Sequence, residues 1–271
     1  MSFELIALDI DGTLLNSRKE VAPETLLAIR EAGAAGKTVT FDTGRAVCEL
    51  ADLFTLLPEI RYAVFSSGAG IYDVRTEKTF ALHGIPRGEA DAIFALARAG
   101  DIMPQIVTAD RDVIQASHLD DLERYHMGIY RPLYEKAMTL VPDIYAFAAS
   151  CKDSMLKINL YHADPAERIR SNTRLSSLKI ERVYSEVSSL ECSAVGVNKG
   201  TGLLRLCGEL GILPEQSIAV GDADNDLPML KVAGLGIAMG NAADHIKAAA
   251  DRVVSDLDHG GCAQAIRMLF S

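Results

Sequence analysis

The stretch Phe3-Glu4-Leu5-Ile6-Ala7-Leu8-Asp9-Ile10-Asp11-Gly12-Thr13 decides the fold. Its first part is a nearly continuous apolar run, which is typical of a strand buried on both faces of a parallel sheet. The run ends in two aspartates, a glycine and a threonine. Parallel α/β sheets bind ligands beyond the carboxyl ends of their strands, which is where these polar residues fall. The chain therefore begins with a buried strand that brings polar side chains to the edge of a sheet.

The same pattern returns along the chain. Further short apolar runs occupy residues 37–41, 62–65, 217–220, 235–238 and 252–254. Between the first two runs of the chain, a helix is predicted from Pro23, where the missing N–H costs nothing, to Gly36, a suitable C-terminal stop. This alternation of strands and helices predicts an α/β fold with a doubly wound parallel sheet.

The middle of the chain, residues 84–186, has a different pattern. Helices are predicted at 87–99 and 165–175, and strands at 105–108, 113–115, 155–161 and 180–184. The turn Ala109-Asp110-Arg111-Asp112 between two of these strands favours a hairpin. We therefore predict a small α+β module at 84–186, inserted into a core made of residues 1–83 and 187–271.

Composition excludes several classes of protein. The formal net charge of the 271 residues is −10 and they contain no block of Lys or Arg, which disfavours nucleic acid and anionic membranes as partners. Five scattered cysteines without a CxxC pair indicate reduced thiols rather than disulfides or a zinc site. No segment resembles a signal peptide or a membrane helix, so we expect a cytoplasmic protein.

Two carboxylates, Asp9 and Asp11, stand two residues apart after the first strand. They would repel each other unless a cation lay between them, and Mg²⁺ suits such oxygen ligands. An aspartate can also attack phosphorus, while a second carboxyl protonates the leaving oxygen and later deprotonates water. Gly12 permits a sharp turn with the backbone close to a ligand. The alternative is a turn whose acids simply face solvent.

Three further clusters offer polar groups. Asp42-Thr43-Gly44-Arg45 could cradle a phosphate with a hydroxyl and backbone N–H groups, although a helix N-cap at Thr43 is a simpler explanation. Lys199 begins a predicted helix that is capped by Asn198. The positive end of the helix dipole makes a cation unfavourable there, so we expect an anion nearby that compensates the charge of Lys199. The alternative is a lysine that is simply solvated at the surface. Gly221-Asp222-Ala223-Asp224-Asn225-Asp226 favours a divalent cation over a plain polar loop.

In this order, the four clusters resemble the motifs of the haloacid dehalogenase-like superfamily of phosphohydrolases, most fully its Cof-type branch with a class IIB cap. The similar segments are Asp9–Leu14, Thr43–Arg45, Asn198–Gly200 and Gly221–Leu230, with Ala233–Ala242 and Asp258–Gly261 also following the pattern. The resemblance covers essentially the whole chain. It implies a HAD-like catalytic core and an inserted α+β cap that selects the substrate.

The resemblance also implies roles for matching residues. Asp9 would be the nucleophile and a Mg²⁺ ligand. Asp11 would be the general acid and base, and would bind Mg²⁺ through its main-chain carbonyl. Asp222 would bind the metal directly. The residues that would hold the phosphoryl group are Thr43, Gly44, Lys199 and Asn225. Those that would support the site or touch substrate are Gly12, Arg45 and Asp226.

Two positions depart from the family pattern. Ser67 stands where this branch commonly has Asn, and because Ser67 can still form hydrogen bonds we expect an altered fit rather than lost activity. Asp42 stands where a small apolar residue is usual. It adds negative charge near a site for anions, so we expect Asp42 to point away from the site or to pair with Arg45.

Together these observations predict a Mg²⁺-dependent phosphomonoester hydrolase that works through a phospho-aspartate. Its substrate would be a small phosphorylated metabolite, first a sugar phosphate, then flavin mononucleotide or pyridoxal phosphate. A phosphotransferase or mutase would use the same motifs, whereas a catalytically silent binding protein would lack Asp9 or Asp11. A P-loop kinase is disfavoured because no GxxxxGK[ST] occurs. We expect a monomer or small homo-oligomer.

Overall fold

The computed structural model describes residues 2–270, which fold into two compact units. The first unit takes in the chain up to Gly44, then Asp52–Ala81 and the residues from Asn198 onward. The second unit consists of Arg45–Ala51 and Leu82–Val197. The second unit extends beyond residue 186 because strand β11, Ser189–Ala194, pairs with β9 and β10 of that unit. Its role as a cap stays a prediction.

The first unit is built on a sheet with the strand order β14-β13-β12-β1-β2-β3-β4-β5. Its strands are β1 Leu5–Leu8, β2 Thr38–Asp42, β3 Tyr62–Phe65, β4 Gly70–Asp73, β5 Lys78–Phe80, β12 Ser217–Gly221, β13 Leu235–Ala238 and β14 Arg252–Val253. Neighbours from β14 to β3 run parallel, whereas β4 and β5 are antiparallel additions that the sequence analysis did not predict. The predicted parallel α/β core is confirmed.

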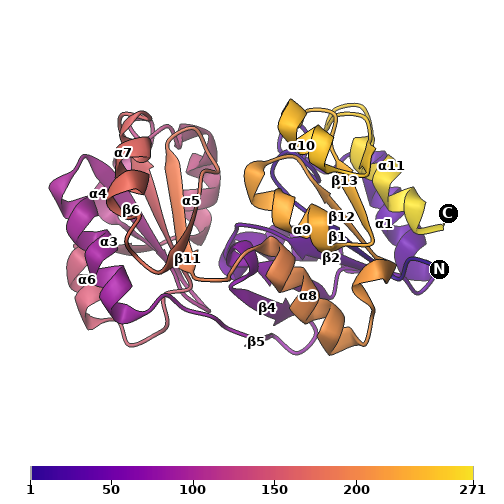
Figure 1. Ribbon diagram of the computed structural model, residues 1–271, viewed down its shortest axis with the longest axis horizontal. Helices are drawn as coiled ribbons and strands as arrows, with labels where there is room; N and C mark the ends of the chain where they lie inside the picture. The colour runs from indigo at the N-terminus through magenta and orange to yellow at the C-terminus, as the bar shows by residue number, and fades with distance from the viewer. Residues whose placement is uncertain (1, 271) are drawn as a thin grey trace. The chain divides into compact units, whose positions relative to one another are not determined.

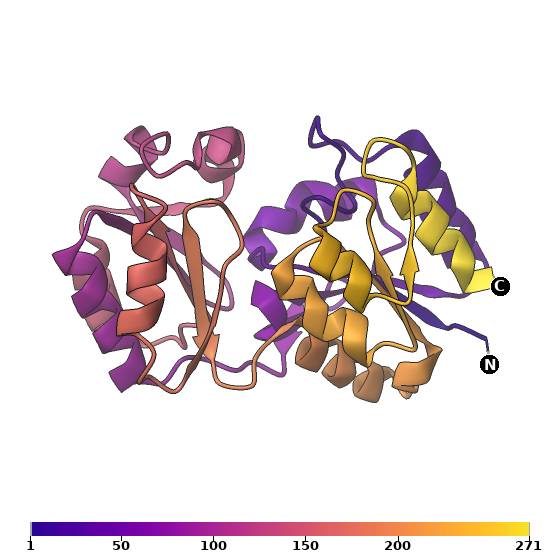
Figure 2. The ribbon, with the colours of Figure 1, turned by 45° about the horizontal axis from the view of Figure 1, so that its top comes forward.

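Helices cover both faces of this sheet. They are α1 Pro23–Ala34, α2 Ala51–Leu56, α8 Lys199–Leu210, α9 Leu227–Val232, α10 Asp244–Ala249 and α11 Gly261–Arg267, with short 3-10 turns η2 Ser66–Gly68, η4 Pro214–Gln216, η5 Asp224–Asp226 and η6 Met268–Phe270. The 3-10 turn η1 Val47–Leu50 belongs to the second unit. Leu5 and Ala7 pack into a cluster with residues of α8 and α9, whereas α1 packs beside α11 (Figures 1 and 2). Residues 5–8 are 0% exposed, which is why this strand is apolar without alternation.

The strand register brings the polar clusters of the sequence to one edge. Strand β1 lies between β2 and β12, with Leu5 opposite Thr38 and Ser217. Because these strands are parallel, their carboxyl ends meet at the same edge of the sheet. Asp9 follows β1, Thr43 follows β2 and Asp222 follows β12. The fold thus gathers side chains that lie up to 213 residues apart in the sequence, from Asp9 to Asp222.

The second unit has a mixed sheet with the strand order β10-β11-β9-β6-β7-β8. Its strands are β6 Ile102–Val107, β7 Asp112–Gln115, β8 Thr139–Val141, β9 Lys157–His162, β10 Ile180–Val183 and β11 Ser189–Ala194. Its helices are α3 Arg87–Ala99, α4 Ala116–Asp120, α5 Arg131–Ala137, α6 Ile144–Ser150 and α7 Glu167–Arg174, with the 3-10 turn η3 Gly128–Tyr130. Residues of α3 and α6 share one apolar cluster with alternate residues of β6 and β9, which is the expected pattern for a sheet packed on helices. In the described part of the chain, no helix combines the length and apolarity needed to cross a bilayer.

Two glycines of α8 have opposite surroundings, which makes the packing of this helix testable. A Cβ added at Gly202 would lie 2.4 Å from Val64 Cγ1 and 2.8 Å from Gly68 Cα, whereas a Cβ at Gly208 would meet nothing within 4 Å. We predict that Gly202→Ala lowers the free energy of unfolding by about 1–3 kcal/mol through overpacking. Gly208→Ala should raise it by about 0.5–1 kcal/mol because alanine loses less backbone freedom. Urea unfolding measures both, and similar effects of the two substitutions would contradict this packing.

Candidate active site

The ammonium group of Lys199 lies between two buried carboxylates. Its Nζ donates to Asp9 Oδ1 at 2.6 Å and to Asp226 Oδ1 at 2.5 Å. Lys199 and Asp226 are 0% exposed and Asp9 is 6% exposed. Burial alone would lower the pKa of Lys199, but the charges of Asp226 and Asp9 offset it and hold that pKa above its ordinary value. Lys199 is therefore a fixed positive charge at the centre of the site.

A capping box places Lys199 at the first position of α8. The side chain of Asn198 accepts a hydrogen bond from Thr201 N at 3.0 Å, and Asn198 N donates to Thr201 Oγ1 at 3.1 Å. A lysine at the start of a helix faces the positive end of the helix dipole. Asp9 and Asp226 are the anions that compensate it.

Asp226 also shapes the loop that follows β12. Its Oδ2 accepts hydrogen bonds from the backbone N–H groups of Asp222 and Ala223, at 2.8 and 2.9 Å. A Cβ at Gly221 would lie 2.4 Å from the Cβ of Asp226, so this close turn requires glycine. One carboxylate of Asp226 thus fixes the direction of Asp222 and the position of Lys199 together.

Asp9, Asp222 and Asp226 form a compact group of carboxylates. Within residues 2–270, one oxygen from each of them lies within 4.8 Å of the other two. Burial raises the pKa of Asp9 well above its usual range, Lys199 opposes this rise, and Asp226 and Asp222 add to it. Burial and the charge of Asp226 raise the pKa of Asp222 to about 7. One lysine does not balance this negative charge, and the oxygen donors fit a hard divalent cation such as Mg²⁺.

Gly12 and Asn241 hold Asp222 from two sides. Gly12 has φ of +92°, and a Cβ on it would lie 2.3 Å from Asp222 Oδ2. Asn241 Nδ2 donates to Gly12 O at 2.9 Å and to Asp222 Oδ2 at 3.1 Å. Thr13 Oγ1 donates to Asp222 Oδ1 at 3.2 Å. No role was predicted for Asn241 from the sequence. Asn241 comes shortly after β13, the parallel neighbour of β12, and this position indicates that it lies at the same edge of the sheet as Asp222.

The Asp11 carboxylate is held outside the group formed by Asp9, Asp222 and Asp226. Lys19 Nζ lies 3.0 Å from Asp11 Oδ1, on the loop that leads from the first strand to α1. Asp11 also forms an isolated bridge with Leu15, which folds this loop back on itself. The two aspartates of the first motif therefore have different cationic partners, Lys199 for Asp9 and Lys19 for Asp11.

Thr43 lies at the carboxyl end of β2 and is tied to the neighbouring strand. Thr43 N donates to Val64 O at 3.0 Å, and Thr43 O accepts from Ser67 N at 2.9 Å. Ser66, Ser67 and Gly68 all have left-handed backbone, with φ of +50°, +56° and +94°. Asn adopts this region more readily than Ser, so the serine at position 67 carries backbone strain beside Thr43.

Asp42 is fully buried, and in the described residues neither of its carboxylate oxygens has a hydrogen-bond partner. The expected pairing with Arg45 is therefore wrong. The expectation that Asp42 points away from the site stays a prediction, although its charge acts to raise the pKa of Lys199. Burial raises the pKa of Asp42 well above its usual range, with Lys199 opposing the rise and Asp226 and Asp9 adding to it.

Several predicted residues lie outside this constellation. Arg45 belongs to the second compact unit, and its predicted role near substrate stays a prediction. Asn225 lies within η5 and is half-buried, and Gly44 follows Thr43 directly, so their predicted contacts with phosphate also stay predictions. Asp224 pairs with His245 at 2.7 Å on the surface and does not join the three-carboxylate group.

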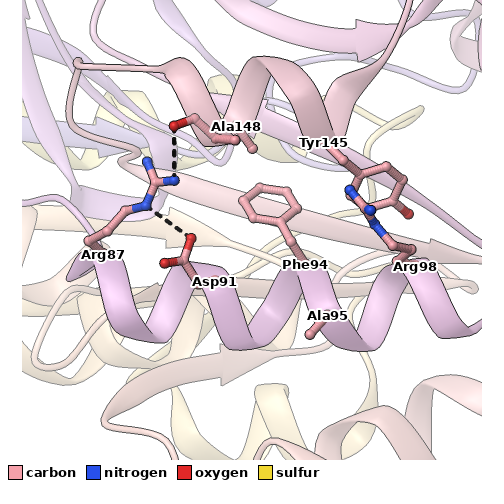
Figure 3. Close-up of a pocket in the computed structure, with 8 residues that line it drawn as sticks. Arg87, Asp91, Phe94, Ala95, Arg98, Tyr145 and Ala148 are labelled. Carbon is pink, nitrogen blue, oxygen red and sulfur yellow. Dashed lines mark hydrogen bonds and ion pairs between the residues drawn. The ribbon is translucent and has the colours of Figure 1, made fainter.

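The second unit has a groove of about 350 Å³ between α3 and α6 (Figure 3). Its lining residues are Arg87, Asp91, Phe94, Ala95, Arg98, Tyr145, Ala148 and Ala149. Arg87 donates to Asp91 Oδ1 at 2.9 Å and to the carbonyl of Ala149 at 3.2 Å. The Arg98 guanidinium lies 4.4 Å from the centroid of the Tyr145 ring. The groove contains none of the predicted site residues, and its charged groups already have partners.

Comparison with known proteins identifies the family of the chain. A family model described as haloacid dehalogenase-like hydrolase matches residues 6–266. The chain therefore belongs to the haloacid dehalogenase-like hydrolase family, and the predicted family is confirmed.

Relatives in this family are named as phosphatases. The chain is 28% identical to 5-amino-6-(5-phospho-D-ribitylamino)uracil phosphatase YcsE of Bacillus subtilis, over 98% of this chain and 96% of that protein. It is 26% identical to pyridoxal phosphate phosphatase YbhA of Escherichia coli, over 98% of each. A solved haloacid dehalogenase-like hydrolase from B. subtilis superposes with a TM-score of 0.86 at 28% identity, over 97% of this chain and 99% of that one. The predicted enzyme class, a phosphatase, is confirmed.

The buried Asp42 carboxyl gives a pH-dependent prediction. A carboxyl with a raised pKa keeps its proton in the folded protein at pH values where the unfolded chain has lost it, so folding stability falls as the pH rises through that range. Asp42→Asn cannot ionise. The stability of this variant relative to the parent protein should therefore increase with pH above about 4, by up to about 1.4 kcal/mol per pH unit. Urea unfolding from about pH 5 to 8 measures it, and a constant difference would show that Asp42 is not a buried acid of this kind.

Proposed function

We propose that this phosphatase is a Mg²⁺-dependent phosphomonoester hydrolase that forms a phospho-aspartate on Asp9. The observation that carries the proposal is that Lys199 binds Asp9 while Asp222 and Asp226 complete a group of oxygen donors around it. Asp9, Asp222 and the carbonyl of Asp11 would hold the cation. When bound, Mg²⁺ would neutralise charge on the phosphoryl oxygens and on the attacking carboxylate.

Asp9 would act as the nucleophile and Asp11 as the proton carrier. Attack of the Asp9 carboxylate on phosphorus forms an O–P bond and breaks the bond to the leaving alkoxide, which takes a proton from Asp11. Asp11 then removes a proton from water, which attacks the phosphorus of the acyl phosphate. Inorganic phosphate leaves and the Asp9 carboxylate is restored. Lys199 keeps Asp9 in one orientation through both steps.

The phosphoryl group would be held by Thr43, Gly44, Lys199 and Asn225. Charge develops on three phosphoryl oxygens during transfer, and fixed donors around them lower the barrier. Thr43 can offer a hydroxyl at the sheet edge because its backbone is tied to Val64 of β3 and to Ser67 of the turn η2. Lys199 supplies the positive charge and stays ionised, because its pKa is raised.

A phosphotransferase or mutase of the same family is the second candidate. It would use the same residues and deliver the phosphoryl group to an alcohol in place of water. Two relatives that match nearly the whole chain are named phosphatases, which favours water as the acceptor. Release of inorganic phosphate without an added alcohol distinguishes the two.

A catalytically silent binding protein would not need the Lys199–Asp9 pair, which is intact.

The named relatives indicate the enzyme class more directly than the substrate class. Two relatives of nearly equal similarity are named for different substrates, a phosphorylated ribitylaminouracil and pyridoxal phosphate, so similarity does not select one. We propose a small phosphorylated metabolite, with a sugar phosphate first, chosen by the second unit acting as a cap. A cytoplasmic location and a monomeric or small homo-oligomeric state stay predictions. A phosphate-release screen over metabolite phosphates tests the choice.

Asp9→Asn should abolish turnover. The amide cannot form the acyl phosphate, and the substitution also removes one charged oxygen ligand, so we expect kcat to fall on the order of 10⁴-fold or more. The matched control is Asp224→Asn, which changes an exposed acid outside the carboxylate group and should leave kcat within about twofold. Steady-state phosphate release measures both variants. Substantial turnover by Asp9→Asn would mean that another residue is the nucleophile.

Metal removal gives a separate prediction. EDTA should silence the enzyme, Mg²⁺ should restore it and Ca²⁺ should restore it poorly. Mg²⁺ requires near-octahedral coordination, whereas Ca²⁺ takes more ligands at longer distances and could bind both oxygens of the Asp9 carboxylate, which blocks attack. Phosphate release in metal-free buffer, with each cation added back, measures this. Full activity without metal would refute the metal requirement.

A further inference from the structure

Lys19 contacts the predicted proton carrier. Its ammonium nitrogen lies 3.0 Å from Asp11 Oδ1, and both residues belong to the first compact unit. The Lys19 and Asp11 side chains are 36% and 26% exposed, so this ion pair is partly shielded from solvent. The contact joins the second aspartate of the Asp9–Asp11 motif to a position eight residues further along the chain.

The loop that carries Lys19 is a closed turn with a fixed backbone. Asn16 Oδ1 accepts from Arg18 N and Glu20 N, both at 3.0 Å, and Asn16 N donates to Glu20 O at 2.9 Å. Lys19 N donates to Asn16 O at 2.9 Å, and Lys19 has left-handed backbone with φ of +59°. A lysine in this region is uncommon, and such conformations persist where surrounding bonds enforce them. The turn therefore presents Lys19 in one defined backbone conformation.

A carboxylate beside a cation site is itself a good cation ligand. An Asp11 carboxylate bound to the cation could not carry a proton to the leaving group and from water. In residues 2–270, the compact group of carboxylate oxygens contains Asp9, Asp222 and Asp226, and Asp11 is not a member of it. Lys19 pairs with the Asp11 carboxylate and offers it a competing positive charge.

We propose that Lys19 is a positioning residue whose ammonium group keeps the Asp11 carboxylate off the cation and available for proton transfer. This inference rests on the proposed function, because it takes Asp11 as the general acid and base. Arg18 supplies a matched control on the same loop. It is exposed, pairs with Glu20 at 3.0 Å and carries the same charge as Lys19.

The first test measures Mg²⁺ binding by calorimetry on the substrate-free full chain. Without Lys19, the Asp11 carboxylate can join the cation, so Lys19→Met should tighten Mg²⁺ binding more than Arg18→Met does. The difference should lie between about 2-fold and 100-fold, the range for coupling between contacting residues. Lys19→Arg should bind Mg²⁺ like the parent protein. In an Asp11→Asn background, Lys19→Met and Arg18→Met should have equal effects. Equal effects of these two variants in the parent background would overturn the proposal.

The second test separates positioning from a structural role. With an alkyl phosphate, whose leaving group needs a proton, Lys19→Met should lower kcat about tenfold or more, part of the 10²–10⁴ that general acid–base catalysis contributes. With p-nitrophenyl phosphate, the burst of the first step should keep its rate, because that leaving group needs little protonation. An equal loss with both substrates would overturn the proposal. If the parent protein hydrolyses no phosphomonoester, the proposed function fails, and the calorimetry still decides the role of Lys19.

Discussion

One ammonium group organises the active site. Lys199 is fully buried and donates to both Asp9, which directly follows β1, and Asp226, which lies in the turn η5 after the adjacent strand β12. A buried charge without partners would destabilise the fold by several kcal/mol, so the lysine and its two carboxylates have to be retained together. Asp226 in turn holds the backbone that directs Asp222 toward Gly12. The proposed nucleophile, the oxygen donors for a cation and the tight turns around them therefore depend on the same interaction.

The sequence predicted the elements whose signal is local. The apolar run before Asp9, helix α3 at 87–99 and the hairpin strands near Asp110 are all present in the structure. The strands β4, β5 and β8 are only three or four residues long, and their pairing depends on neighbours that a local pattern does not contain. Strand β11 carries Glu191 and three serines or cysteines among its six residues, which hides its strand character. The inserted module was predicted to end at residue 186, so β11, which begins at Ser189, was assigned to the core.

The candidate site shows the same division between local and long-range signals. Motif residues such as Asp9, Asp222 and Lys199 could be named from sequence because each follows a strand or begins a helix. Their partners Asn241 and Lys19 could not, because they act through bonds that only folding creates. Asp226 was named from its motif, but its bond to Lys199 could not be read from the sequence. Asp42 was expected to point away from the site or to pair with Arg45, and its carboxyl lies buried without a hydrogen-bond partner. Such a buried acid, together with the strained Ser66–Gly68 turn, is typical of a site shaped for function at some expense of stability.

The central claim is that phosphate passes through Asp9. Acyl phosphates are reduced by borohydride, whereas free carboxylates are not, so acid-quenching the enzyme during turnover and then reducing it marks the residue that carried phosphate. The account predicts that peptide mass spectrometry finds Asp9 converted to homoserine when substrate is present, and unmodified when substrate is omitted. Conversion of a different aspartate, or an unmodified Asp9 in an enzyme that is turning over substrate, would contradict the account.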